Sequence, residues 1–269
     1  MADKNNVIKM NTLLAKVDHS QAVFNKEVTA YAGLFRNKQG MFRGERKTYA
    51  AREGYQEDAT KQGTTAVQST VNEQFDWFTD KVAMNYLTEQ FSVEATNSIG
   101  AKKVPLIVDG VKLGELTALD LMRLKSILTS APLDTMYELI PVRSDSEVWT
   151  KADGDYANRE VYCTPMLKGV TRTTESEEVI LKDPNLDPAH LPANYNAKTT
   201  VKKKTVEIGD YTMQKFSGEW TQTQKAQLLD RKSRLLNAVI AALKDVNDIE
   251  AAPSNLDVKA LLNYIHKGA

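Results

Sequence analysis

The residues with the clearest capacity for chemistry form a basic stretch at residues 36–52. Phe42 and Tyr49 are interleaved with the cations, and Glu45 is the one acidic residue among them. Basic side chains contact phosphate groups and aromatic rings stack on bases, so this composition is typical of a nucleic-acid or polyanion-binding surface. The candidate contact residues are Arg36, Lys38, Arg43, Arg46, Lys47 and Arg52.

The same stretch has a second interpretation, which is a solvated arm whose charges pair with acidic residues such as Glu53, Glu57 and Asp58. The 269-residue chain carries 35 basic and 35 acidic residues, so no global field steers it toward nucleic acid or anionic lipid. A further basic run at residues 202–204 is a weaker candidate, because lysines on a strand often guard a sheet edge against pairing. Both interpretations stay open.

Metal ligands and nucleophiles are sparse. The histidines His19, His190 and His266 are far apart in sequence, and the single cysteine, Cys163, excludes an internal disulfide and a cysteine-based metal site. The motifs HExxH, GxSxG, GxxxxGKS/T and GxGxxG do not occur. We therefore predict no catalytic residue, no metal and no cofactor. Cys163, within an apparent strand, is expected to be a buried and inert thiol.

A β-hairpin that leads into a helix is the clearest structural element, at residues 103–132. Asp109-Gly110 is a preferred pair for a two-residue type I′ turn, since both positions need a positive φ. The turn predicts a register with Ile107 opposite Lys112. The apolar pairs on the other face are Val108 with Val111 and Leu106 with Leu113.

Thr117 is predicted to cap the helix, with Asp120 at the capping-box position. Apolar spacing also predicts helices at residues 20–35 and 64–90, followed by a strand at residues 91–98. The later strand candidates, which are separated by turns and a proline-rich loop that contains His190, are residues 160–167, 171–181 and 199–208.

A long C-terminal helix is predicted from Thr221 or Thr223 to Asn247, with leucines close to a seven-residue repeat. It either covers a sheet of its own domain or packs against the same helix of a second copy. The candidate oligomer-interface residues are Leu228, Leu235, Val239 and Leu243. A last helix is predicted to be capped by Ser254, with Asp257 at its third position.

These elements predict an α+β fold with an antiparallel sheet, several amphipathic helices and a long C-terminal helix. We expect one domain over residues 1–269, with a possible N-terminal arm at residues 1–18 and a charged segment at residues 36–60. No apolar run is long enough to span a membrane, and the lone cysteine fits a cytoplasmic protein.

The runs IVDGVKLGELTALDLMRLKSIL, VWTKAD and KKTVEIGDYTMQKFSGEWT together resemble a family of uncharacterised bacterial proteins. The shared pattern is a Val-Asp-Gly turn, a leucine-rich helix, a tryptophan and a Lys-x-Ser-Gly segment before a long C-terminal helix. The matching positions are Val108, Asp109, Gly110, Leu121, Leu128, Trp149, Lys215, Ser217 and Gly218. The resemblance loosely covers residues 20–248. It implies a bacterial, cytosolic α+β protein and no activity.

Together, these observations predict a non-enzymatic, self-associating cytoplasmic protein with a structural or scaffolding role, whose partner is a second copy of itself. Neutral net charge leaves self-association unopposed. One alternative is a nucleic-acid or polyanion-binding module that uses residues 36–52. Another is an enzyme of unfamiliar type, with His190 as the first residue to test.

Overall fold

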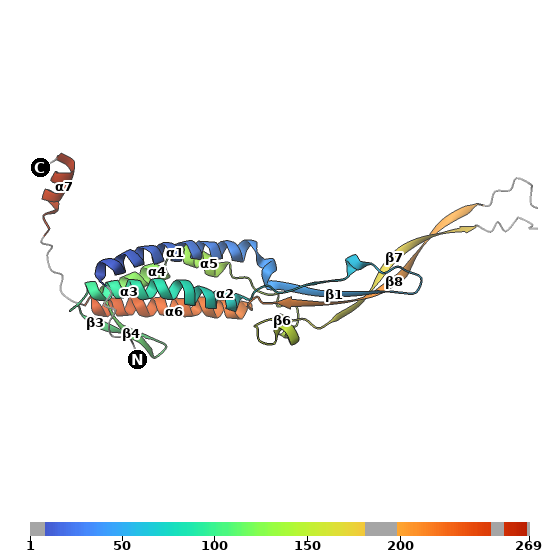
Figure 1. The fold of residues 1–269 in the computed structure, drawn as a ribbon, viewed down its shortest axis with the longest axis horizontal. Coiled ribbons are helices and arrows are strands. Elements are labelled where there is room, and N and C mark those ends of the chain that lie inside the picture. The colour runs from blue at the N-terminus through green and yellow to red at the C-terminus, as the bar shows by residue number, and fades with distance from the viewer. Residues whose placement is uncertain (1–8, 181–197, 249–255, 268–269) are drawn as a thin grey trace, which may run out of the picture. The chain divides into compact units, whose positions relative to one another are not determined.

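A computed structural model describes residues 9–180, 198–248 and 256–267 (Figure 1). The fold is α+β, as predicted. Contacts divide the chain into two compact units, each built from segments that are distant in sequence. Unit 1 comprises Met1–Ala30, Asp80–Glu138 and Ala226–Ala269, and unit 2 comprises Tyr31–Thr79 and Leu139–Lys225. Whether the two units behave as the single expected domain stays a prediction.

Unit 1 contains most of the helices and a small hairpin. Helix α1 begins in unit 1 and ends in unit 2, and α6 begins in unit 2 and continues through unit 1. The helices of this unit are α1 (Met10–Asn37), α3 (Met84–Asn97), α4 (Ala118–Leu128), α5 (Ala131–Glu138), α6 (Gln222–Val246) and α7 (Val258–Lys267). Strands β3 (Lys103–Val108) and β4 (Val111–Thr117) form the hairpin. The predicted arm at residues 1–18 is therefore helical from Met10 onward.

The β3–β4 turn has the predicted geometry, but part of the register differs. Asp109 has a φ of 50° and Gly110 a φ of 80°, which is the left-handed conformation of a type I′ turn. A bulge next to Leu106 pairs it with Gly114, so the predicted pairing of Leu106 with Leu113 is wrong. Leu106 is 3% exposed and Leu113 is 59% exposed. An extra residue in one strand redirects the side chains beyond it, and this bulge turns Leu113 away from the core.

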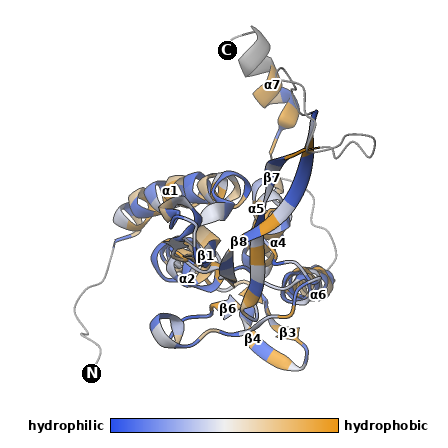
Figure 2. Ribbon diagram, turned by 90° about the vertical axis from the view of Figure 1, so that its right-hand side faces the viewer, coloured by the Kyte–Doolittle hydropathy of each residue, from blue (hydrophilic) through white to orange (hydrophobic). Residues whose placement is uncertain are grey.

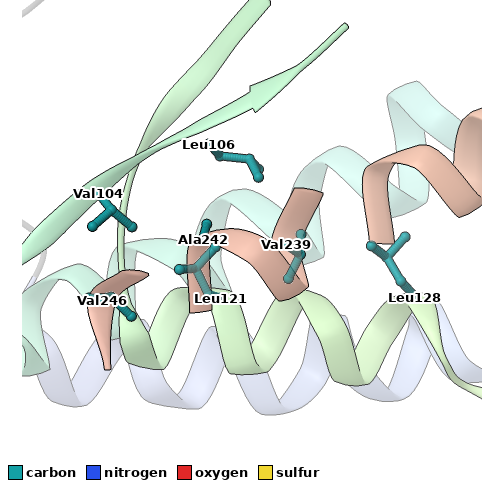
Figure 3. Packing of buried hydrophobic residues seen from close by; sticks show 7 residues of the cluster. All are labelled: Val104, Leu106, Leu121, Leu128, Val239, Ala242 and Val246. Atoms are coloured by element: carbon teal, nitrogen blue, oxygen red, sulfur yellow. The ribbon is translucent and has the colours of Figure 1, made fainter. Parts of the chain in front are cut away.

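One hydrophobic core cluster of unit 1 lies between the hairpin, α4 and α6 (Figure 3). Apolar side chains from the three elements meet there, and burial of each valine or leucine typically contributes about 1.5–3 kcal/mol. The buried cluster consists of Val104, Leu106, Leu121, Leu128, Val239, Ala242 and Val246. The sequence-predicted stripe of α4 therefore covers both the hairpin and the long helix α6.

The hydrogen bonds of the predicted capping box at the start of α4 are present. The Asp120 backbone N–H donates to Thr117 Oγ1 at 3.3 Å, and the Thr117 N–H donates to Asp120 Oδ2 at 2.9 Å. Both residues are buried. The cap therefore joins β4 to α4 inside the core, where an unpaired backbone N–H would be costly.

Unit 2 is built on an antiparallel sheet with β8 as its central strand. The order β2-β1-β8-β6-β5 describes the main path, and β7 also pairs with β8. The strands are β1 (Arg43–Ala51), β2 (Gly63–Thr65), β5 (Thr150–Lys151), β6 (Tyr162–Cys163), β7 (Leu167–Ile180) and β8 (Thr199–Ser217). The later strand candidates of the sequence correspond to β6, β7 and β8, but β6 is shorter than predicted, β7 begins earlier and β8 continues to Ser217.

Aromatic rings pack on the helical side of unit 2. The ring centroid of Phe35 lies 6.0 Å from that of Phe42 and 5.8 Å from that of Phe75. Trp220 stacks on Phe75 at 5.2 Å and donates its indole N–H to Asn72 Oδ1 at 2.6 Å. Each buried aromatic ring removes a large apolar area from water, so this cluster holds the end of α1 and helix α2 (Val71–Phe78) to the segment after β8.

Two helix and strand predictions need correction. The helix expected from residue 64 begins at Val71, because Thr70 forms a capping box with Glu73 and Gly63–Thr65 pairs with β1 as β2. The strand expected at residues 91–98 is the second half of α3, whose side chains Gln90 and Glu94 are buried and hydrogen-bonded to each other. Alternating apolar residues over so short a run fit a helix as well as a strand.

The C-terminal helices are largely as expected. Thr221 caps α6, since its Oγ1 accepts from the Gln224 N–H at 3.1 Å. Asp257 caps α7 and accepts from the Ala260 N–H at 2.9 Å, although it was expected inside the helix. The predicted cap Ser254, the proline-rich loop and His190 lie outside the described residues.

The Thr117 cap can be tested by Thr117→Val, which keeps the shape of the side chain and removes its hydroxyl. We expect the free energy of unfolding to fall by about 1–2 kcal/mol, because the Asp120 N–H loses its buried acceptor. Urea denaturation followed by circular dichroism measures the change. The matched control, Thr88→Val on the exposed surface of α3, should change it by less than about 0.5 kcal/mol. Equal effects at both positions would contradict the role of the cap.

Candidate functional site

The predicted polyanion-binding residues lie at the end of α1 and along β1 in unit 2. Arg36 lies in the last turn of α1 and Lys38 just follows it, whereas the remaining cations lie on β1 or just after it. Strand β1 pairs with β8 along its whole length and with β2 over part of it. Its cations are therefore placed by the sheet of unit 2 rather than by a mobile arm.

Several of these cations are paired within unit 2. The Arg43 Nε lies 2.7 Å from Glu219 Oε1, and the Lys47 ammonium lies 3.0 Å from Glu45. The guanidinium of Arg46 lies over the ring of Phe216. These contacts fit the second interpretation of the stretch, that of charges paired inside the chain. Polyanion binding by this stretch stays a prediction.

A pocket of about 570 Å³ lies beside Arg43 in unit 2. Lys215 of β8 forms an ion pair with Glu147 at its wall, and Trp149 donates its indole N–H to the Ser144 carbonyl at 2.9 Å. From the sequence, Trp149 and Lys215 were expected only as matching positions of the family pattern, not as pocket residues. Long-range pairing of β8 brings them together, and no local pattern in the sequence signals this.

Glu219 is the buried acid of this pocket. Its side chain is 3% exposed, and Oε2 accepts from the Ser217 hydroxyl at 3.1 Å while Oε1 accepts from Arg43. Burial raises the pKa of the Glu219 carboxyl above its ordinary value, and the Arg43 cation opposes that rise. The cations Arg43 and Lys215 are each held by a carboxylate, so the chemistry of the pocket is that of structural ion pairs.

The most unusual surface of the described chain is the outer half of the β7–β8 pair, at residues 172–180 and 199–207. We call this the β-ribbon. Figure 1 shows β7 and β8 continuing together past the end of β1. Nearly all of its side chains are exposed on both faces, and Figure 2 shows that hydrophilic residues dominate it. The sequence predicted the two strands but not that they pair with each other alone.

A bulge marks the base of the β-ribbon. The β7–β8 register shifts between Thr171 and Arg172, which leaves Ile208 without a partner on β7. The Ile208 carbonyl instead accepts from the Arg52 backbone N–H at 3.0 Å and from the Tyr49 hydroxyl at 3.3 Å. The chain after β1 is thereby fixed to β8 at the residue where the β-ribbon begins. Bulges bend a strand and increase its twist, so this one sets the direction of the β-ribbon.

Two tyrosine rings stiffen the sheet below the bulge. The ring of Tyr49 covers Gly209, and the ring of Tyr211 covers Gly169, so closely that a methyl group on either glycine would overlap the ring. Glycine in a strand weakens it unless another group packs over the bare backbone. These tyrosines supply that packing.

Ion pairs add to the base on its exposed side. Glu207 accepts from Arg172 at 3.1 Å and also from Arg52, which bonds Asp210 at 3.0 Å as well. Exposed ion pairs contribute little singly, but in this network Glu207 of β8 is shared by Arg172 of β7 and by Arg52, which follows β1, so three segments are joined. Arg52, predicted to contact polyanions, is thus part of the base of the β-ribbon.

Beyond the Arg172–Glu207 ion pair at its base, the charges of the β-ribbon are segregated by strand. Strand β7 carries Glu175, Glu177 and Glu178, and β8 carries lysines at residues 202–204. In the register, Glu175 lies opposite Lys204 and Glu177 lies opposite Lys202. Opposite charges across a strand pair stabilise it by about 0.2–1 kcal/mol each.

The predicted interface residues of α6 lie mostly in the core of unit 1. Val239 is fully buried, and Leu235 and Leu243 pack against the same cluster. Leu228 is half-buried. A contact with another subunit through Leu235, Val239 and Leu243 would require this core cluster to open. These positions therefore support the alternative in which α6 covers its own domain.

Of the remaining candidates, the structure describes the side chains of Cys163 and His19. Cys163 is half-buried rather than buried, with its Sγ 3.8 Å from Thr150 Oγ1, and His19 is exposed. Within residues 9–180, 198–248 and 256–267, no three His, Cys, Asp or Glu side chains converge as metal ligands would. Over the same residues no helix is both long and apolar enough to cross a bilayer.

Glu219→Gln is expected to alter how stability depends on pH. Because burial raises the pKa of Glu219, the folded protein keeps a proton that the unfolded chain releases above its ordinary pKa of about 4.3. The wild type therefore loses stability as pH rises from the ordinary glutamate pKa to the raised pKa of Glu219. The variant does not show this loss, because glutamine does not titrate. Urea denaturation from about pH 4 to about pH 8 should show the unfolding free energy of the variant gaining on that of the wild type as pH rises.

Glu115→Gln is the matched control. A 2.7 Å hydrogen bond from Lys112 lowers the pKa of Glu115, so this exposed group stabilises the folded state above the ordinary pKa and loses that effect in acid. The difference between the control and the wild type should therefore move in the opposite direction with pH. The same slope for both variants would contradict the burial of Glu219 as the cause.

No curated protein and no solved structure matches the chain. One family model matches residues 7–268, which is nearly the whole length, and its description is a family of unknown function, DUF7873. The expectation of an uncharacterised family is thereby confirmed. The chain, with its α+β fold, its β-ribbon and its buried Glu219, belongs to the family of unknown function DUF7873.

Proposed function

We propose that this protein is a non-enzymatic, cytoplasmic structural protein that associates with copies of itself through the β-ribbon. The observation that carries the proposal is the exposure of the β-ribbon on both faces over residues 172–178 and 201–205. An isolated two-stranded ribbon is marginally stable in water and usually needs a third strand or a packed face. A second subunit would supply that support.

The open edges of the β-ribbon favour a partner that adds strands. Among the residues that the structure describes, β7 pairs only with β8, and residues 199–207 of β8 pair only with β7. An exposed strand edge presents a row of unpaired N–H and C=O groups, which is a template for pairing with another chain. Strand addition satisfies these groups without a deep cleft.

Two further properties fit a protein that assembles with itself. The formal net charge is zero, so identical copies do not repel each other as whole bodies. The pocket cations are neutralised by Glu147 and Glu219, so the polar chemistry of unit 2 serves its own fold. A cytoplasmic location is consistent with Cys163 as a free thiol.

The proposal is tested by removing the β-ribbon. Residues 172–208 are replaced with Asn-Gly, which joins the paired residues Thr171 and Gly209 through a two-residue turn. Mass photometry and sedimentation velocity at micromolar concentration should show the full chain as an oligomer and the shortened chain as a monomer. Circular dichroism and thermal melting check that the shortened chain is folded.

Leu228→Ala serves as the matched control on α6, because it trims a half-buried residue of the helix interface considered above. It should leave association unchanged. A full-length chain that remains a 30.0 kDa monomer would overturn the proposed function. Association that survives removal of the β-ribbon, or that is lost with Leu228→Ala, would place the interface elsewhere.

A further inference from the structure

We propose that the β-ribbons of neighbouring copies pair side by side and point in the same direction, with the β8 edge of one copy against the β7 edge of the next. This inference rests on the proposed function, and it names the partner surface. The contact is heterologous, since each copy uses its β8 edge to bind one neighbour and its β7 edge to bind the other. Such a contact builds a ring or an open filament rather than a two-fold dimer.

Backbone geometry allows the register within one β-ribbon to be repeated in the contact between copies. In an antiparallel sheet the N–H and C=O groups of successive residues point alternately to the two neighbouring strands. Residues of β8 that do not bond to β7 of their own chain therefore face outward, and so do their cross-strand partners on β7. The outward groups of the two copies meet when the register within one β-ribbon, such as Glu175 opposite Lys204, is repeated between copies.

The charges of the lysines on β8 and the glutamates on β7 also favour pairing of the β8 edge of one copy with the β7 edge of the next. In the repeated register each lysine at residues 202 and 204 lies between a glutamate of its own chain and the same glutamate of the neighbouring copy. Glu175 and Glu177 would likewise lie between two lysines. The sheet would carry rows of alternating charge, and each added opposite pair favours it by about 0.2–1 kcal/mol.

The symmetric alternatives bring like charges together. A two-fold pairing of β8 with β8, centred on the basic run, places Lys203 opposite itself and Lys202 opposite Lys204. A two-fold pairing of β7 with β7 brings together its acidic run at residues 175–178. Like charges directly opposite each other destabilise a strand pair. The lysines thus guard against one kind of edge pairing and admit another, which is how an interface gains specificity.

The neighbouring structure leaves this edge accessible over most of its length. Strand β1 occupies the β8 edge from Gly209 to Ser217, and the Arg52 N–H bonds the Ile208 carbonyl. In the part of the chain that the structure describes, no strand follows on that edge beyond the bulge. Residues 199–205, all exposed except the half-buried Thr200, span about 20 Å of strand, which is the length of a typical strand in a sheet.

Charge reversal tests which edges meet. One variant changes all three lysines of residues 202–204 to glutamate, a second changes Glu175, Glu177 and Glu178 to lysine, and a third carries both sets of changes. Each single-strand variant should associate at least about tenfold more weakly than the wild type, because favourable pairs are replaced by like-charge pairs. The double-strand variant restores the pairing and the neutral net charge, so it should associate as the wild type does. Circular dichroism confirms folding in all three.

A disulfide trap tests the register directly. Thr174 and Thr205 lie opposite each other in the β-ribbon, and both are neutral and exposed. Chains carrying Cys163→Ser with either Thr174→Cys or Thr205→Cys are oxidised separately and as a mixture. Opposed strand residues lie within reach of a disulfide, so only the mixture should give a cross-linked dimer on a non-reducing gel.

The outcomes separate this inference from the proposed function. A monomeric wild type overturns both. A wild type that associates while either cysteine chain cross-links with itself shows a two-fold pairing and overturns the inference alone. Equal association of the wild type and both single-strand charge variants overturns it as well. A cross-link formed only in the mixture, together with rescue by the double-strand variant, supports it.

Discussion

The antiparallel pairing of β8 with its neighbours is the constraint on which the rest of unit 2 depends. Its 19 residues pair with β1, β6 and β7, so one strand carries the sheet, the wall of the Glu219 pocket and the β-ribbon. The bulge at Ile208 divides it into an inner part that shares two neighbours and an outer part that has one. The β8 edge of the β-ribbon is exposed because β1 pairs with β8 only from Gly209 to Ser217.

The charges of this protein mostly stabilise its own structure. Arg43 neutralises the buried Glu219, Arg52 joins Glu207 to Asp210, and Lys215 pairs with Glu147. A buried acid is costly unless a cation and hydrogen bonds compensate it, which explains why a basic residue is needed at position 43. Two cations of the basic stretch, Arg43 and Arg52, therefore have a structural role in unit 2. The glutamates of β7 and the lysines of β8 in the β-ribbon differ from these ion pairs, because they are exposed and lie along two open strand edges.

Local features were predicted well wherever a few adjacent residues decide the conformation. The Asp109-Gly110 turn needs a positive φ, and the Thr117 and Thr221 caps satisfy nearby backbone N–H groups, so short motifs are sufficient. The predicted pairing of Leu106 was wrong because a bulge depends on how the hairpin packs against α4 and α6. Residues 91–98 failed because alternation over a few residues does not distinguish a strand from the end of a helix, and burial of Glu94 beside Gln90 decided it.

By itself the sequence determined the α+β class, the turn, the helix caps and the apolar stripes, because these arise from interactions between residues close in the chain. Only the tertiary structure decided that Val239 and Leu243 belong to an internal core, that Arg43 meets Glu219 across 176 residues, and that β7 and β8 run on as a pair beyond the sheet. The physical reason is that strand pairing and charge compensation join segments whose separation in sequence leaves no local periodicity to read. The acidic and basic runs were visible from the start, but their opposition on a shared β-ribbon exists only once the chain has folded.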